Sequence, residues 1–248
     1  VPRIGASITR QGLAVLNQLS AMDIPVLNAP LAISRSRDKL LAMQLLAQEG
    51  LDVPRTVMAH PGEDAEVAVA AVGGLPVVVK LLKGTQGVGV MLASSMEEVR
   101  SYLSTFHELR EDVVLQEFVA ESAGRDVRAL VVGGRVVAAM RRRAGGGDFR
   151  SNLHRGGTGE ALALPLDWQA LALRAARVVG LEVAGVDLLE GRDGPRVMEL
   201  NSSPVLEGIE RATGIDVAGA LMDHALEFAR SERASRTSTA APVLALPS

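Results

Sequence analysis

Hydrophobic positions along the chain follow two different periods, which separate the expected helices from the expected strands. Leu40, Met43 and Ala47 recur at helical spacing after a polar start, and Gly50 ends that pattern. Further helices are expected at 8–22, 62–74, 95–106, 167–180 and 215–230. Short apolar runs with glycine turns predict three hairpins, at 76–93, 126–143 and 183–201. Helices mixed with antiparallel hairpins predict an α+β fold.

The two ends of the chain have patterns of their own. Residues 1–5 and 24–28 read as strands on either side of the helix at 8–22, as in the last part of an α/β unit. The chain begins without methionine and inside an expected strand, so we expect it to be part of a longer protein. Residues 232–248 are rich in Ser, Ala and Thr and predict a disordered tail.

Composition narrows the class of protein. The 248 residues, of which 48% are hydrophobic, suffice for one large core or two smaller ones. A net charge of −3 disfavours a general nucleic-acid-binding role, and no apolar run is long enough to cross a membrane. Cysteine is absent, which excludes disulfides, zinc–thiolate sites and a thiol nucleophile, and which fits a reducing cytoplasm.

The hairpin "GVDLLEGRDGPRVMELN" carries the strongest metal signal. Glu199 and Asn201 share one face of its second strand, and a turn centred near Asp193 places Asp187 opposite Glu199. Two carboxylates and an amide that converge in this way suit Mg²⁺, a hard cation that prefers oxygen ligands. An exposed strand face whose polar residues meet water explains the hairpin alone about as well, although its apolar flanks favour an internal strand pair.

The stretch "KLLKGTQGVGV" places Lys80 at the end of an apolar strand, just before a glycine-rich loop. Its lysines precede the glycines and a strand follows, so it fits neither the P-loop nor the dinucleotide-binding fingerprint. A glycine flap between antiparallel strands instead folds its backbone N–H groups over phosphates, with Lys80 beneath as a point charge. A plain hairpin with a snorkelling lysine is the alternative for this stretch alone. Together with the carboxylate hairpin, the loop indicates a site for Mg²⁺ and ATP.

Long stretches of the chain resemble ATP-grasp carboxylate–amine ligases of the RimK type, over residues 1 to about 231. They are "PRIGASITRQG", "RDKLLAMQLLAQEGLDVPRT", "VVKLLKGTQGVGV", "VLQEFV", "DVRALVVGGRVVAAMRRRAGGGDFRSNLHRGG", "VAGVDLL" and "VMELNSSPVLEGIERATGIDVA". The resemblance implies an ATP-grasp fold at 31–231, whose two α/β subdomains, at about 40–115 and 116–231, clasp ATP. Residues 1–30 are then a remnant of the N-terminal pre-ATP-grasp domain, most of which is lacking.

The resemblance also implies a reaction and its participants. Enzymes of this type add L-glutamate to the C-terminus of a small-subunit ribosomal protein through an acyl phosphate, using ATP and Mg²⁺, with Mn²⁺ as a substitute. We therefore expect a cytoplasmic ligase that binds an acceptor protein and does not bind nucleic acid or membranes directly. A homo-oligomeric assembly is compatible with this type.

The family's site residues carry over to matching positions in this sequence. Two lysines meet the nucleotide phosphates, the glycine loop closes over them, a hinge pair lies beside the adenine, and an acidic residue lies near the ribose. The implied nucleotide contacts are Lys39, Lys80, Gly84, Gln86, Gly87, Gly89, Glu117, Phe118, Asp126, Arg150, Ser151 and Asn152. Of these, Lys80, Arg150 and Asn152 are expected to act at the reacting phosphoryl group. The implied metal ligands are the hairpin residues Asp187, Glu199 and Asn201.

The basic segment "MRRRAGGGDFRSNLHR" supplies candidate substrate contacts. Strand alternation puts Arg141 and Arg143 on one face, where they and His154 are expected to hold substrate carboxylates. For Arg142, His154 and Arg155, a solvated basic loop is at least as good an explanation.

Three other functions stay open at this point. An ATP-grasp ligase for another amino acid, a carrier protein or a dipeptide would use the same nucleotide site. A kinase-like phosphotransferase fits the glycine flap, but the chain has no "HRD" or "DFG" pair. A non-enzymatic nucleotide binder is the third.

Overall fold

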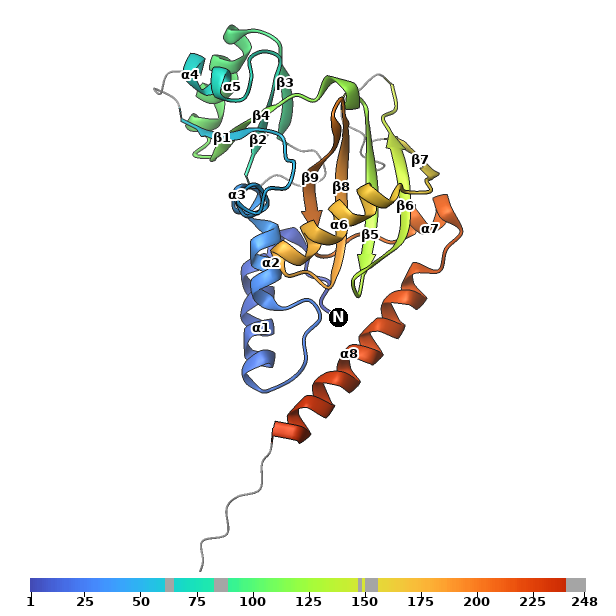
Figure 1. Ribbon diagram of the computed structural model, residues 1–248. Coiled ribbons are helices and arrows are strands. Elements are labelled where there is room, and N and C mark those ends of the chain that lie inside the picture. Colours follow the sequence, from blue (N-terminus) through green and yellow to red (C-terminus); the bar gives the residue numbers. More distant parts are fainter. Residues whose placement is uncertain (61–64, 83–88, 147–148, 150–155, 240–248) are drawn as a thin grey trace, which may run out of the picture.

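Two antiparallel sheets, each covered by helices, form the body of the protein (Figure 1). The computed structural model describes residues 1–60, 65–82, 89–146, 149 and 156–239. Within this part of the chain, strands and helices alternate in the mixed order that the sequence predicts for an α+β fold.

The first sheet has four strands and carries the lysine identified above. Its spatial order is β1 (Thr56–Ala59), β4 (Val113–Glu117), β2 (Val77–Leu81) and β3 (Val90–Ala93). Helices α4 (Ala65–Ala71) and α5 (Met96–Glu108) pack on it. Val77, Val79 and Leu115 point toward these helices because alternate strand residues share a face, and they form an apolar core with Val99 and Leu103. The intervening residues, Lys80 among them, are left for the opposite face.

The second sheet has five strands and carries the carboxylate hairpin. Its spatial order is β7 (Thr158–Ala161), β6 (Arg135–Arg143), β5 (Arg125–Val132), β8 (Val183–Gly191) and β9 (Gly194–Asn201). A short 3₁₀ helix, η2 (Ala120–Ser122), leads into it from the first sheet. Helices α3 (Lys39–Gln48) and α6 (Leu166–Val179) bury one face through a core that includes Leu46, Val127, Ala175 and Val186. Helix α7 (Glu207–Thr213) packs on the opposite face, where Ile209 meets Leu130 and Met140.

The N-terminal segment folds as helices instead of the expected strand–helix–strand unit. It comprises η1 (Ala6–Ile8), α1 (Thr9–Ala21) and α2 (Pro30–Arg37). The expectation of strands at 1–5 and 24–28 is wrong. Backbone groups in this segment make hydrogen bonds with side chains and with nearby turns instead of with the backbone of a neighbouring strand. Arg37 donates to the Ile4 carbonyl at 2.6 Å.

Asn28 fastens the N-terminal segment to the second sheet. Its side chain is 2% exposed. The amide nitrogen Nδ2 donates to the carbonyls of Val183 (2.7 Å) and Ser202 (3.2 Å). The amide oxygen Oδ1 accepts from the N–H groups of Glu182 and Val183, each at 2.8 Å. All four hydrogen bonds of this buried amide are therefore made to the start of β8 and to the residue after β9.

The last helix, α8 (Val217–Thr239), runs further than the sequence suggested. Val217 and Leu221 anchor its first turns in the core, and Figure 1 shows its later turns extending away from the sheets. A disordered tail from residue 232 is thus wrong for 232–239, where Glu, Arg and Ala are good helix formers. Residues 240–248 lie outside the described part. None of the helices described combines the length and the apolar character needed to cross a membrane.

Candidate active site

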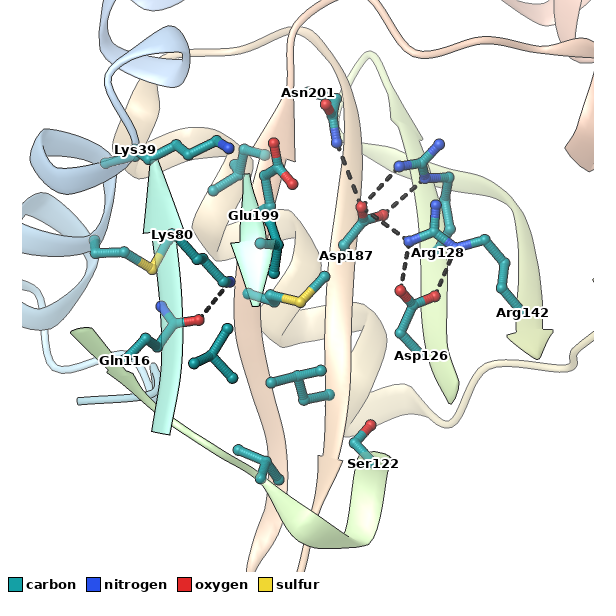
Figure 2. Close-up of a pocket in the computed structure, with 18 of the residues that line it drawn as sticks. Lys39, Lys80, Gln116, Ser122, Asp126, Arg128, Arg142, Asp187, Glu199 and Asn201 are labelled. Carbon is teal, nitrogen blue, oxygen red and sulfur yellow. Dashed lines mark hydrogen bonds and ion pairs between the residues drawn. The ribbon is translucent and has the colours of Figure 1, made fainter. Parts of the chain in front are cut away.

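A cavity of about 410 Å³ lies where the two sheets face each other, within the size range of small-ligand sites. Residues from α3, β2, β4, β5, β8, β9 and α7 line it, so it draws on both sheets and on the helix between them. Figure 2 shows Lys39 and Lys80 on one side of the site, and Asp187 with Arg128 and Arg142 on the other. The candidate residues in its lining are Lys39, Lys80, Glu117, Phe118, Asp126, Asp187, Glu199 and Asn201.

Two lysines reach the cavity from different elements. Lys39 is the first residue of α3, directly after the cap residue Asp38, whose carboxylate accepts from the Leu41 N–H at 2.9 Å. Lys80 lies near the end of β2, and its ammonium donates to Gln116 Oε1 at 2.5 Å (Figure 2). Desolvation by burial lowers the pKa of Lys80 to about 8, although Glu199 opposes the shift. A desolvated ammonium whose hydrogen bond goes to a neutral amide is suited to an anionic ligand.

The carboxylate hairpin has the expected register but reaches it through a bulge. Leu188 pairs with Val197, whereas Asp187 pairs with Glu199, so Met198 is an extra residue in β9. Without it, strict alternation from the core residue Val197 would turn Glu199 into the core. The bulge keeps Asp187, Glu199 and Asn201 on the cavity side together, as the sequence predicts. Asp187 is 2% exposed, so the hairpin does not present it on a solvated face, although β9 is an edge strand of the sheet.

Two arginines hold Asp187 in place. Arg128 donates from Nε to Oδ1 and from Nη2 to Oδ2, both at 2.7 Å, and Arg142 Nη2 lies 3.0 Å from Oδ2. Asn201 Nδ2 donates to the same Oδ2 at 3.4 Å. Burial alone would raise the pKa of Asp187, but the charges of Arg128 and Arg142 outweigh it and hold that pKa below its usual value. Asp187 is therefore an ionised carboxylate in the interior.

Asp126, expected near the ribose, is committed to Arg142. Its Oδ1 and Oδ2 accept from Arg142 Nε and Nη2 at 2.6 and 2.7 Å, in a bidentate pair. Both side chains are almost fully buried, although both line the cavity. The structure thus places Asp126 in the support of Arg142 and Asp187, and its assignment to the ribose stays a prediction.

The hairpin residues fit a divalent cation by their donor chemistry. Asp187 and Glu199 bring two carboxylates and Asn201 an amide oxygen, and all three reach the same cavity. Across the described residues, no cluster of three or more His, Cys, Asp or Glu side chains forms a metal-ligating group. Such all-oxygen sets suit Mg²⁺, which keeps some ligand positions for water and phosphate.

The hinge candidates lie where β4 leaves the first sheet. Glu117 accepts from Arg55 Nε at 3.1 Å and from Arg196 Nη1 of β9 at 2.8 Å. Its carboxylate therefore joins the two sheets. Burial favours a higher pKa, but the hydrogen bonds from Arg55 and Arg196 hold the pKa of Glu117 below its usual value. Phe118 packs edge-on against Phe149, with ring centroids 6.5 Å apart.

The structure does not bring the substrate candidates Arg141 and Arg143 to the cavity. Arg141 pairs with Glu190 and Glu160, and Arg143 pairs with Glu160. Arg142, for which a solvated basic loop was at least as good an explanation, lines the cavity instead. Arg141 and Arg143 do share a face of β6, as strand alternation predicts, but Met140 and Arg142 are on the face that lines the cavity.

Gln116 and Arg128 are among the polar cavity residues that the sequence did not single out. Each follows or precedes a run of buried apolar strand residues, in "VVLQE" and "VRALVV", and a polar residue at such a position is the signal that could have found them. Gly89 is described at the start of the return into β3, where its φ of +72° favours glycine and its carbonyl accepts from the Leu81 N–H at 2.9 Å. The predictions for Gly84, Gln86, Gly87, Arg150, Ser151, Asn152 and His154 lie outside the described residues.

Comparison with known proteins decides the family. The profile of the RimK-like ATP-grasp domain matches residues 36–225, and that of the RimK PreATP-grasp domain matches residues 1–33. The chain belongs to the RimK-like ATP-grasp family. It is thus an ATP-dependent ligase domain, and the family and fold expected from the sequence are confirmed.

Two relatives of this RimK-like domain carry the same functional name. A probable alpha-L-glutamate ligase of Rhodopirellula baltica is 51% identical over 90% of this chain and 55% of its own length. A probable alpha-L-glutamate ligase of Thioalkalivibrio sulfidiphilus is 51% identical over 94% of this chain and 77% of its own length. The chain therefore spans about half of the first relative and about three quarters of the second.

A solved ATP-grasp structure supports the same placement of the RimK-like fold. The ATP-grasp ligase PsnB, complexed with a phosphomimetic variant of its minimal precursor, Mg and ADP, has a TM-score of 0.67 and 25% sequence identity. The likeness covers 91% of this chain and 68% of PsnB.

Proposed function

We propose that this domain catalyses the ATP- and Mg²⁺-dependent addition of L-glutamate to the C-terminal carboxylate of an acceptor protein. One observation carries the proposal: Lys39 and Lys80 share a single cavity with Asp187, Glu199 and Asn201, between the two sheets. Cations and metal ligands in one cavity suit a nucleotide polyphosphate with its divalent ion. The names of the relatives supply glutamate, and the complex of PsnB with Mg and ADP supports the same nucleotide and ion here.

Asp187, Glu199 and Asn201 are the proposed holders of Mg²⁺, with Mn²⁺ as a substitute. When bound, the ion supplies positive charge against the phosphate oxygens. The chain's own cations complement it: Lys80 meets the phosphates from β2, and Lys39 from the start of α3. Glu117 and Phe118 are proposed to border the adenine, since both line the cavity where the two sheets join.

The proposed chemistry needs no covalent enzyme nucleophile, in keeping with a chain without cysteine. A carboxylate oxygen of the acceptor bonds to the γ-phosphorus of ATP. The bond between this phosphorus and the β,γ-bridging oxygen breaks, which gives an acyl phosphate and ADP. The amine of glutamate then attacks the acyl carbon, phosphate departs and the nitrogen loses a proton. Lys80 offsets charge on the transferring group. The loop with Gly84, Gln86, Gly87 and Gly89, together with Arg150, Ser151, Asn152 and His154, is proposed to close the site.

The proposed acceptor is a small-subunit ribosomal protein in the cytoplasm, as the resemblance implies. The test is intact mass spectrometry of that protein after incubation with this chain, ATP, Mg²⁺ and glutamate. We expect a ladder spaced by one glutamyl unit, absent with Asp187→Asn. Asp193→Asn is the matched control, because Asp193 is exposed in the turn of the same hairpin. ATP consumption that is independent of every amino acid and acceptor would contradict ligation.

A second acceptor class has its own support, because PsnB was captured with a precursor of its own. A panel of amino acids, carrier proteins and dipeptides in the same assay separates this alternative. A nucleotide binder without activity would bind ADP but would form none from ATP when an amino acid is added.

A further inference from the structure

The Asp187 carboxylate, the proposed metal ligand, is already surrounded by donors. Its Oδ2 receives Arg128 Nη2 at 2.7 Å, Arg142 Nη2 at 3.0 Å and Asn201 Nδ2 at 3.4 Å. Its Oδ1 receives Arg128 Nε at 2.7 Å. Two carboxylate oxygens offer about four lone-pair positions in all. Because Oδ2 already receives three donors, a cation that binds Asp187 through Oδ2 must displace at least one of these contacts (Figure 2).

The two arginines differ in how firmly they are held. Arg142 also makes a bidentate pair with Asp126, and its side chain is 4% exposed. The Arg128 side chain is 15% exposed and lines the cavity. Within the part of the chain that the structure describes, both hydrogen bonds of the Arg128 guanidinium go to Asp187. Arg128 is thus the partner of Asp187 that is free to turn toward a ligand.

Charge counting gives the direction of the exchange. Asp126 and Asp187 balance Arg128 and Arg142, so the group is neutral while buried. A divalent ion added at Asp187 would face two guanidinium groups, and like charges in a low dielectric repel strongly. A polyphosphate relieves that repulsion, because it offers the Arg128 guanidinium new acceptors of the kind arginine prefers.

We infer that Arg128 occupies the place of the cation on Asp187 and gives it up when a nucleotide polyphosphate enters. This inference rests on the proposed function and adds a coupling to it: metal and nucleotide bind together much more strongly than either does alone. By linkage, the factor by which ADP tightens the metal equals the factor by which the metal tightens ADP.

The experiment measures Mn²⁺ binding to the whole chain by the electron paramagnetic resonance signal of free Mn²⁺, with and without ADP. The complex of Mn²⁺ with ADP alone is measured separately and subtracted. Three proteins are compared: wild type, Arg128→Met and Arg125→Met. Arg125 is the matched control, because it lies on the same strand and lines the same cavity but pairs with Glu190. Arg128→Lys, which keeps the charge and loses the bidentate geometry, is the second variant if Arg128→Met does not fold.

In the wild type and in Arg125→Met, ADP should tighten Mn²⁺ by on the order of tenfold or more. In Arg128→Met, Mn²⁺ without ADP should bind on the order of tenfold tighter than in the control, and the effect of ADP should shrink. Arg128→Lys should lie between the two. The inference is overturned if Mn²⁺ without ADP binds Arg128→Met no tighter than Arg125→Met. If the wild type holds no Mn²⁺ even with ADP, the proposed function falls as well.

Discussion

The Lys80 ammonium donates to Gln116 Oε1 across 2.5 Å, from one strand of the first sheet to its neighbour. Gln116 is 4% exposed, and its amide nitrogen donates to Thr56 Oγ1 at 2.8 Å. The Thr56 hydroxyl in turn donates to the Pro54 carbonyl at 2.9 Å. This chain of donors allows only one orientation of the Gln116 amide, with its oxygen toward the lysine. Gln116 therefore fixes where the Lys80 charge sits in the cavity.

Replacing Gln116 tests that positioning. Gln116→Met removes the acceptor and keeps a similar volume, so the ammonium loses a hydrogen bond worth about 1.5–3 kcal/mol. We expect nucleotide affinity to fall by on the order of tenfold, measured by titration calorimetry with ADP and Mg²⁺. Gln48→Met at the exposed end of α3 is the control. Equal affinities for the two variants would remove Gln116 from the site.

The lowered pKa of Lys80 predicts how nucleotide binding depends on pH. The charged form predominates below about pH 8 and is lost above it, because burial lowers the pKa to about 8. The ADP dissociation constant should be flat at lower pH and rise up to about tenfold per pH unit above pH 8. Lys80→Met should bind weakly at all pH values, without that rise. A rise of equal steepness in the variant would assign it to another group.

The lowered pKa of Lys80 also affects folding stability, which should increase with pH where nucleotide affinity decreases. Between about pH 8 and the ordinary lysine value of about 10.4, the unfolded chain holds the Lys80 proton while the folded protein has lost it. The free energy of unfolding contributed by this group therefore increases with pH over that window. Urea unfolding of wild type and Lys80→Met at pH 7.5 and 10 measures the contribution.

Removing the Lys80 charge should nearly abolish turnover. Lys80→Ala deletes a cation beside the proposed transferring group, a loss on the order of a hundredfold or more in kcat/KM. ADP release in the presence of glutamate and acceptor provides the measurement. Arg135→Ala, at the exposed start of β6, is the control for lost positive charge. Near-normal turnover by Lys80→Ala would refute its assignment.

Glu117 should hold the two sheets together most firmly when ionised. Glu117→Gln weakens charge-assisted hydrogen bonds to Arg55 and Arg196, at a cost of about 1–3 kcal/mol in unfolding free energy. Because the pKa of Glu117 is lowered, the wild-type advantage should be full above about pH 4.3 and fade as pH falls below it. Denaturation at pH 7 and pH 3.5 tests this, with Glu121→Gln, whose partner Arg192 is exposed, as the control.

Neighbouring arginines on β6 should respond very differently to the same change. Arg142→Met leaves the buried carboxylate of Asp126 without its bidentate partner and removes one partner of Asp187, which should cost about 3–5 kcal/mol of stability. Arg143→Met breaks an exposed pair with Glu160, and we expect little measurable change. Urea midpoints of the two variants provide the comparison. A larger loss for Arg143→Met would contradict the burial of the Asp126 network.

The sequence predicted the features that depend on local geometry. Asp187, Glu199 and Asn201 converge as expected, because a hairpin brings its own strands together whatever the remainder of the chain does. The extra residue Met198 could not be foreseen. Alternation counted from Val197 and alternation counted from Leu200 disagree about Glu199, and only the packed sheet decides between them.

Features that depend on distant partners were missed. Residues 1–5 and 24–28 have the composition of strands. Asn28, however, donates hydrogen bonds to β8 and to the residue after β9, which lie more than 150 positions away in the sequence. Arg128 and Gln116 were overlooked because an isolated polar residue in a strand acquires meaning only from what it faces across the cavity. The inward position of Arg142, likewise, follows from the contact between β6 and α7 over Met140.

The clamp made by Asn28 bears on where this protein can be divided. The two family profiles meet between residues 33 and 36, yet a single amide from the first region fills the hydrogen-bonding needs of the second. A shortened chain that began at residue 36 would lack Asn28. The backbone N–H groups of Glu182 and Val183 and the carbonyl of Ser202, which directly follows Asn201, would then lose these hydrogen bonds. The boundary between the two family profiles is therefore crossed by buried hydrogen bonds, and we expect the two regions to fold and unfold together.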